Sequence, residues 1–119
     1  MAAGAGRRSV GAMHALVVTY CLADGTSEVE HAELCEQLAP AFAAFPGLAS
    51  LTWLTNGDTG CYGGFYVFDT KSAFDRFVAS ELFETMRAHG SLRSVTTSDF
   101  AISDGPTAVT YGPVGARPR

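Results

Sequence analysis

The chain has 119 residues, 47% of them apolar and only 17% charged, so it is long enough for one folded domain but too short for two. Its formal charge of −4 excludes a protein that binds nucleic acid through a basic surface, because phosphate recognition needs clustered cations. Three cysteines without a C-x-x-C pair predict small buried apolar side chains in a reducing cytosol.

The N-terminal segment, residues 1–12, is small, glycine-rich and unpatterned, and predicts a flexible arm ahead of a domain that begins at Met13. It contains no apolar run of signal-peptide length, and nothing in the chain approaches the length of a membrane span. We therefore expect a cytoplasmic protein.

The first expected elements are a strand and an amphipathic helix. Residues 14–22 (HALVVTYCL) are rich in apolar and β-branched side chains and predict a strand. Ser27 and Glu30 have the spacing of a capping box, in which each side chain accepts a hydrogen bond from a free amide at the start of a helix. The helix that follows has an apolar face with three- and four-residue spacing: His31, Leu34, Cys35, Leu38, Ala41, Phe42 and Phe45.

Pro40 lies inside this helical pattern and should bend the helix or divide it into two offset pieces, because proline removes one helical hydrogen bond. Pro46-Gly47 ends the element. Residues 48–55 predict a second strand, and the turn residues at 56–60 connect it as a hairpin to a third strand over residues 62–68.

A second helical region begins after Asp69-Thr70, has a break near Ser80 and ends by Gly90. Residues 92–102 predict a fourth strand, and residues 105–119 form a tail with one short strand candidate over 108–111.

The predicted order is β-α-β-β-α-β, which is an α+β, ferredoxin-like arrangement with an antiparallel sheet, over residues 13–104. Its helices cover only one face of the sheet. The first and third strands are nonetheless apolar on both faces, although a sheet with one solvated face should alternate. A second copy of the sheet is the simplest cover for the other face, so we expect a homodimer.

Two adjacent glycines, Gly63 and Gly64, begin the aromatic third strand. Glycine within a strand often marks a place where a ligand or another backbone comes close. The pair therefore indicates either a pocket or the close approach of a helix or a partner sheet.

Three segments also have a familiar pattern: Glu36-Gln37-Leu38 followed by Pro40; Pro46-Gly47-Leu48 with Trp53 seven residues after the proline; and Gly63–Phe68 (GGFYVF) followed by Lys71-Ser72-Ala73. Over about residues 14–104 the chain resembles the YdhR-type monooxygenases, which belong with the antibiotic-biosynthesis monooxygenases to the dimeric α/β-barrel superfamily. The resemblance implies a ferredoxin-like subunit that pairs with its partner into a barrel and has a pocket between helices and sheet. It also implies oxidation of an aromatic or polyketide-like molecule without metal, flavin or other cofactor.

An oxygenase of this kind needs a base, donors for a developing oxyanion and aromatic walls that exclude water. His31 is the candidate catalytic base, because it lies on the apolar face of the first helix; the alternative is a histidine at the helix boundary that is exposed or bonded to a neighbour. Trp53, Tyr66 and Tyr20 are the candidate substrate-binding residues, and their alternative is packing in the core or the dimer interface.

Other polar residues have simpler explanations. His89 suits the dipole at the end of the second helical region, and Asn56, which resembles a substrate-holding asparagine of some antibiotic-biosynthesis monooxygenases, is part of a strong turn pair. No metal cluster or phosphate-binding loop is recognisable. The leading hypothesis is thus a monooxygenase; the alternatives are a non-oxidative cyclase or isomerase, or a small-molecule-binding accessory protein without chemistry.

Overall fold

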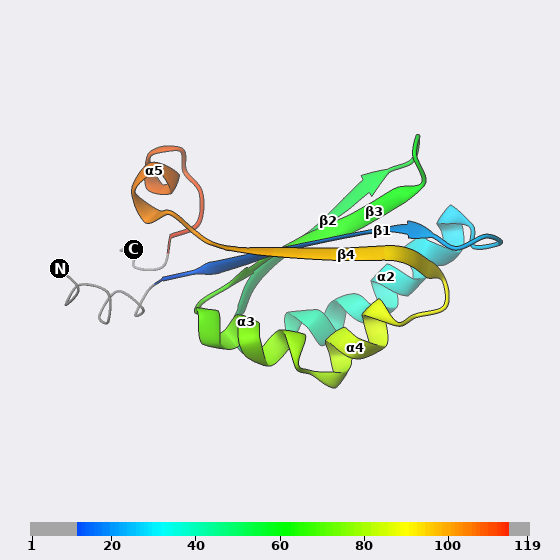
Figure 1. Ribbon diagram of the computed structural model, residues 1–119, viewed down its shortest axis with the longest axis horizontal. Helices are drawn as coiled ribbons and strands as arrows, with labels where there is room; N and C mark the ends of the chain where they lie inside the picture. Colours follow the sequence, from blue (N-terminus) through cyan, green and yellow to red (C-terminus); the bar gives the residue numbers. More distant parts are fainter. Residues whose placement is uncertain (1–11, 115–119) are drawn as a thin grey trace.

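A four-stranded antiparallel sheet organises residues 12–114, the part of the chain that this computed structural model describes (Figure 1). The expected arm over residues 1–12 lies, except for residue 12, outside the described residues. The strands stand in the order β2-β3-β1-β4, and every paired neighbour is antiparallel. The elements are, in chain order, β1 (His14–Leu22), α2 (Glu28–Ala43), β2 (Leu48–Asn56), β3 (Cys61–Phe68), α3 (Lys71–Val78), α4 (Glu81–Arg87), β4 (Leu92–Ala101) and α5 (Asp104–Val109).

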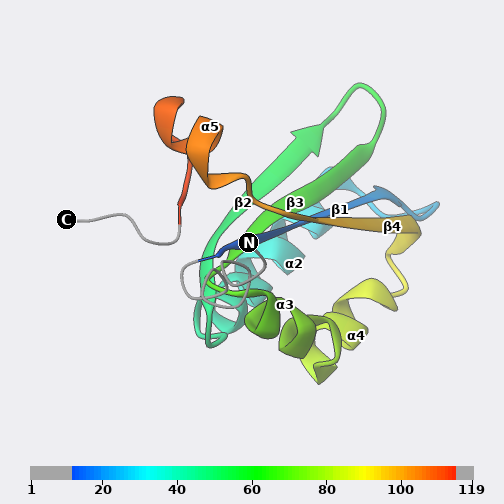
Figure 2. The ribbon, with the colours of Figure 1, turned by 60° about the vertical axis from the view of Figure 1, so that its left-hand side comes forward.

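This arrangement confirms the predicted α+β, ferredoxin-like fold, with the second helical region divided into α3 and α4. Helices α2, α3 and α4 lie together on one face of the sheet, and α5 lies apart from them beyond the end of β4 (Figures 1 and 2). The pairing of two such sheets into a barrel stays a prediction.

Helix starts follow the capping residues seen in the sequence. The Ser27 backbone amide donates to Glu30 Oε1 at 2.8 Å, and the Glu30 amide donates to Ser27 Oγ at 3.1 Å, which completes the capping box. Thr70 and Ser80 cap α3 and α4 with a single bond each, in which the side-chain oxygen accepts from the backbone amide of Ala73 and of Phe83, respectively. Pro40 does not divide α2, contrary to one expectation, because it removes only one amide donor near the end of the helix, and the Ala44 amide still closes the last turn on the Pro40 carbonyl at 3.1 Å.

The core lies between the sheet and the helices. Phe77 of α3 is at its centre, with ring centroids 6.0 Å from Phe42, 5.2 Å from Phe68 and 5.2 Å from Phe83. Contacts between rings at these separations add to the stabilisation from burying the rings themselves. This aromatic cluster anchors α2, α3 and α4 to the sheet.

The double glycine accommodates neighbouring strands of the same sheet. A Cβ at Gly63 would collide with the backbone carbonyl oxygen of Val18 on β1. A Cβ at Gly64 would lie 2.9 Å from Leu51 Cδ1 and 2.9 Å from Tyr66 Cε1, both at the ends of side chains. Close approach of another backbone, one of the two expected explanations, therefore applies to Gly63, and the neighbour is β1 rather than a helix or a partner sheet.

Two predictions are wrong. The strand expected over residues 108–111 is instead the end of α5 and the turn after it, so the β-branched Val109 and Thr110 did not indicate an extended backbone. Cys21 and Cys61 form a disulfide, and only Cys35 is free. The two half-cystines are directly opposite each other on β1 and β3, a juxtaposition that arises only once the strands pair. Separately, no helix within residues 12–114 has the length and apolar character of a membrane span.

Candidate functional site

An open groove of about 460 Å³ lies between the first half of α2 and the β2–β3 hairpin. Its aromatic walls are Trp53 of β2 and Tyr62 of β3, and its floor includes His31. The volume suits a small organic molecule. The complete lining consists of Glu28, His31, Ala32, Cys35, Glu36, Trp53, Leu54, Thr55, Gly57, Tyr62 and Gly63.

A second, inner cavity of about 20 Å³ lies deeper between α2 and the sheet, and it has room for about one water molecule. It shares His31, Cys35, Trp53 and Gly63 with the groove. All four residues proposed from the sequence line this inner cavity: His31, Trp53, Tyr66 and Tyr20.

His31 stands where the two cavities meet. Its side chain is buried, with 6% of the residue exposed, so it is not a surface histidine, whereas the alternative of a histidine bonded to a neighbour agrees with its contact to Tyr20. The capping box starts α2 one turn earlier and orients this residue toward the sheet. Its Nε2 lies 2.7 Å from the Tyr20 hydroxyl and 3.5 Å from Cys35 Sγ, and its ring centroid is 4.4 Å from that of Tyr62.

Burial sets the protonation of this cluster. It lowers the pKa of His31, and it raises the pKa of Tyr20 and of the Cys35 thiol, so imidazole, phenol and thiol are all neutral at pH 7. We therefore assign the hydrogen bond as Tyr20 O–H donating to His31 Nε2, which leaves the imidazole proton on Nδ1. A neutral imidazole in this hydrogen bond can accept a proton in two ways. The Tyr20 hydroxyl can turn away and free Nε2 for a proton from another molecule, or Tyr20 can pass its own proton to Nε2 and take one up in its place.

The other two predicted residues have different surroundings. Trp53 is 36% exposed and lies opposite Gly64, so its ring borders both the groove and the inner cavity. Tyr66 is 4% exposed and packs 6.0 Å from Phe42 and 5.2 Å from Phe77, centroid to centroid, within the aromatic cluster. It reaches the inner cavity but not the groove, which agrees with the core alternative as well as with a binding role.

Sequence reasoning missed Tyr62, Cys35 and Glu28 as groove residues. Glu28 and Cys35 are three residues before and four residues after His31, so helical spacing alone places them on its side of α2. Tyr62 lies opposite Tyr20 in the β1–β3 register, which becomes visible only after the strands are paired. Burial, and then the neighbouring Glu28 carboxylate, raise the pKa of Tyr62.

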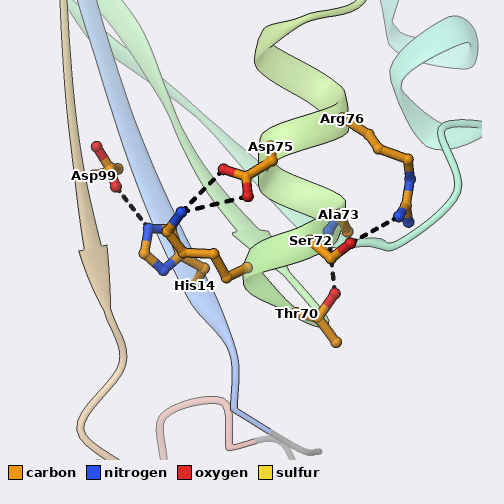
Figure 3. Close-up of polar contacts among 8 residues, drawn as sticks. His14, Thr70, Ser72, Ala73, Asp75, Arg76 and Asp99 are labelled. Atoms are coloured by element: carbon orange, nitrogen blue, oxygen red, sulfur yellow. Dashed lines mark hydrogen bonds and ion pairs between the residues drawn. The ribbon is translucent and has the colours of Figure 1, made fainter. Parts of the chain in front are cut away.

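The second buried histidine, His14, lines neither cavity. Figure 3 shows its ring directed at Asp99 on the neighbouring strand, with Nε2 2.7 Å from Asp99 Oδ2. Its ring also packs 4.7 Å from that of Phe74, centroid to centroid. These contacts tie β1 to β4 and to α3.

The remaining candidates lie outside the groove. His89 Nδ1 accepts from the Ser91 backbone amide at 3.2 Å and is 2.8 Å from the Ser91 hydroxyl, while the Asn56 carbonyl accepts from the amides of Thr59 and Gly60 in the hairpin turn. Within residues 12–114, no group of three or more His, Cys, Asp or Glu side chains is arranged to hold a metal ion.

The family model described as "Putative mono-oxygenase ydhR" matches residues 20–113, most of the chain. The chain belongs to the YdhR family. Among curated proteins, none matches it.

Solved structures share the fold of this YdhR-family chain at low sequence identity. SnoaB, a cofactor-independent oxygenase from Streptomyces nogalater, is 20% identical with a TM-score of 0.57, over 76% of this chain and 91% of SnoaB. A dimeric ferredoxin-like protein of unknown function from Thermobifida fusca is 12% identical (TM-score 0.64; 77% and 92% covered). A hydroxynitrile lyase from Passiflora edulis is also 12% identical (TM-score 0.63; 77% and 94% covered). At these identities the likeness establishes the fold alone.

Proposed function

We propose that this YdhR-family protein is a cofactor-independent monooxygenase that acts on an aromatic or polyketide-like small molecule. One observation carries the proposal: a buried neutral imidazole, His31, bonded to Tyr20 at 2.7 Å, forms the floor of a 460 Å³ groove with aromatic walls. The family description and the fold shared with SnoaB support it.

In this mechanism the substrate supplies the electrons. His31 removes one proton from an activated CH2 group, and the resulting carbanion passes electrons to dioxygen and, after taking the proton back, forms a hydroperoxide at that carbon, which still carries one hydrogen. The peroxide loses water to leave a carbonyl, so one oxygen atom enters the product and the other leaves as water. Tyr20 returns or relays the proton on His31. Trp53 holds the ring system in the groove, and Tyr66 contacts only a substrate group that reaches the inner cavity.

Oxygen consumption with an anthrone as substrate tests this proposal. The wild-type protein should consume dioxygen in proportion to product, and His31→Ala should lower kcat/KM about a hundredfold or more, the usual contribution of a general base. His89→Ala is the control, because the His89 ring contacts Ser91 and lines no part of the groove. A loss of less than about threefold in His31→Ala would remove the base from the mechanism.

A non-oxidative cyclase or isomerase is the second candidate, because the same base and phenol can move protons without oxygen. The fold shared with a hydroxynitrile lyase supports this candidate by analogy only. Conversion of the substrate at an equal rate under nitrogen would favour this candidate. Ligand binding without any product in air would favour an accessory binding protein.

We also propose a homodimer in which the sheets pair through the face opposite α2, α3 and α4. Phe100, 58% exposed, and Leu54, 38% exposed, provide apolar area for it, and the Thermobifida relative is described as dimeric. Sedimentation should give twice the monomer mass at micromolar concentration; a monomer would contradict this pairing. A cytoplasmic location remains part of the proposal, although the Cys21–Cys61 disulfide is unusual in a reducing compartment.

A further inference from the structure

The charged residues that line the groove are all acidic. Glu28 and Glu36 of α2 line it, and its described lining contains no lysine or arginine. His31 adds no compensating charge, because burial lowers its pKa and keeps it neutral. None of the ion pairs found within residues 12–114 includes Glu28 or Glu36. Both carboxylates therefore face the groove without a cationic partner among the described residues.

The aromatic walls of the groove also favour a positively charged ligand. Trp53 and Tyr62 present rings to the groove, and the negative face of an aromatic ring attracts a cation within about 6 Å. Glu28 reaches the hairpin end of the groove, since its Oε2 would lie 3.5 Å from a Cβ at Gly57. Carboxylates and rings together form a setting for a flat molecule with a positive charge at one side.

We propose that the natural ligand of this groove is an aromatic compound that carries a positively charged nitrogen, held by Glu28 and Glu36 while its ring contacts Trp53 and Tyr62. That such a compound is the substrate of the reaction rests on the proposed function, whereas its binding in the groove does not. Such a compound also removes an electrostatic difficulty of that reaction. Loss of a proton makes the reacting part of the substrate anionic beside two carboxylates, and a cationic nitrogen on the same molecule offsets the repulsion.

Three ligands with one skeleton and different charge test the proposal: 2-phenylethylamine, 2-phenylethanol and phenylacetate. Trp53 is the only tryptophan in the chain and lines the groove, so its fluorescence reports binding directly. At low salt the amine should bind most tightly and phenylacetate most weakly, with about tenfold between them, and the difference should shrink as salt screens the charges.

The variants Glu28→Gln and Glu36→Gln should each weaken binding of the amine about threefold, as expected for exposed charge pairs, and leave binding of the alcohol unchanged. Glu81→Gln on α4 is the matched control, because it changes net charge equally but lines no part of the groove. Phenylacetate binding as tightly as the amine, an amine preference that survives Glu28→Gln/Glu36→Gln, or no binding of any of the three ligands would each overturn the proposal.

This result is independent of the oxygenase test. Binding is measured at equilibrium without turnover, so phenylacetate could bind best while His31-dependent oxygen consumption still holds. Equally, the amine preference could be found in a protein that consumes no oxygen, which would leave the ligand class intact and refute the reaction.

Discussion

At one end of the paired strands β1 and β3, Tyr20 lies opposite Tyr62, and His31 of α2 contacts both. At the other end, His14 lies opposite Phe68 and bonds to Asp99. Each histidine is 6% exposed, yet of the two only His31 lines the groove of about 460 Å³. Burial of a histidine therefore does not identify a site by itself; the space beside it and the hydrogen-bond partner of its ring decide the role.

The partners differ in kind. Asp99 is a carboxylate whose side chain is 44% exposed, so the His14–Asp99 pair lies partly in contact with solvent. The pair links β1 to β4. Tyr20 is a neutral, buried phenol whose pKa is raised by burial, so the His31 pair is a hydrogen bond between two neutral groups. In the proposed mechanism the groove end transfers protons, whereas the contacts of His14 at the opposite end hold β1, β4 and α3 together.

The largest expected effect comes from the disulfide at the groove end. Cys21 and Cys61 are 40 residues apart in sequence, and closing a loop of that length stabilises a fold by roughly 4 kcal/mol in the chain-entropy model. The variant Cys21→Ala/Cys61→Ala should lose up to about that much free energy of unfolding in urea. A reductant should destabilise the wild type and leave the variant unchanged; equal responses would mean that the bond contributes nothing.

The two glycines beside this bond should respond differently to alanine. Gly63→Ala places a Cβ against a backbone carbonyl that cannot turn away, and we expect a loss of about 3 kcal/mol or more in the free energy of unfolding. Gly64→Ala meets the ends of Leu51 and Tyr66, which can shift, and should cost about 1 kcal/mol. Similar losses in both variants would show that the strand spacing adapts at either position.

Local signals account for most of what the sequence predicted. Strand ends and helix caps were found because their causes lie within a few residues, as with Ser27 and Glu30. The position of His31 on the inner side of α2 followed from helical spacing in the same way. What was missed depends on strand register: the Cys21–Cys61 bond and the Tyr20–Tyr62 pair exist only when β1 and β3 align, and no spacing within either strand reveals them.

At the opposite end, His14→Ala should lower stability but not activity. The change removes a hydrogen bond and the packing against Phe74, and should cost about 2 kcal/mol in urea unfolding. Asp99→Asn is the companion variant, which keeps the shape of the side chain and should cost less. Binding of 2-phenylethylamine, followed by Trp53 fluorescence, should be unchanged in both. Loss of binding would mean that the two ends are coupled.

The smallest expected effect is the pH dependence that His31 gives to stability. Its pKa in the folded state is lowered by burial from 6.5, so above pH 6.5 the folded and unfolded states both hold a neutral imidazole and stability is at its full value. As the pH falls below that value, the unfolded state takes up the proton first, and the free energy of unfolding declines until the folded state is protonated as well. His31→Asn removes this contribution, so the stability of the variant should fall less steeply than that of the wild type between about pH 7 and pH 5. Urea unfolding at several pH values measures both slopes. If stability fell with pH equally steeply in the variant and the wild type, His31 would be more solvated than its place on the groove floor implies. The distinction between the two buried histidines would then no longer hold.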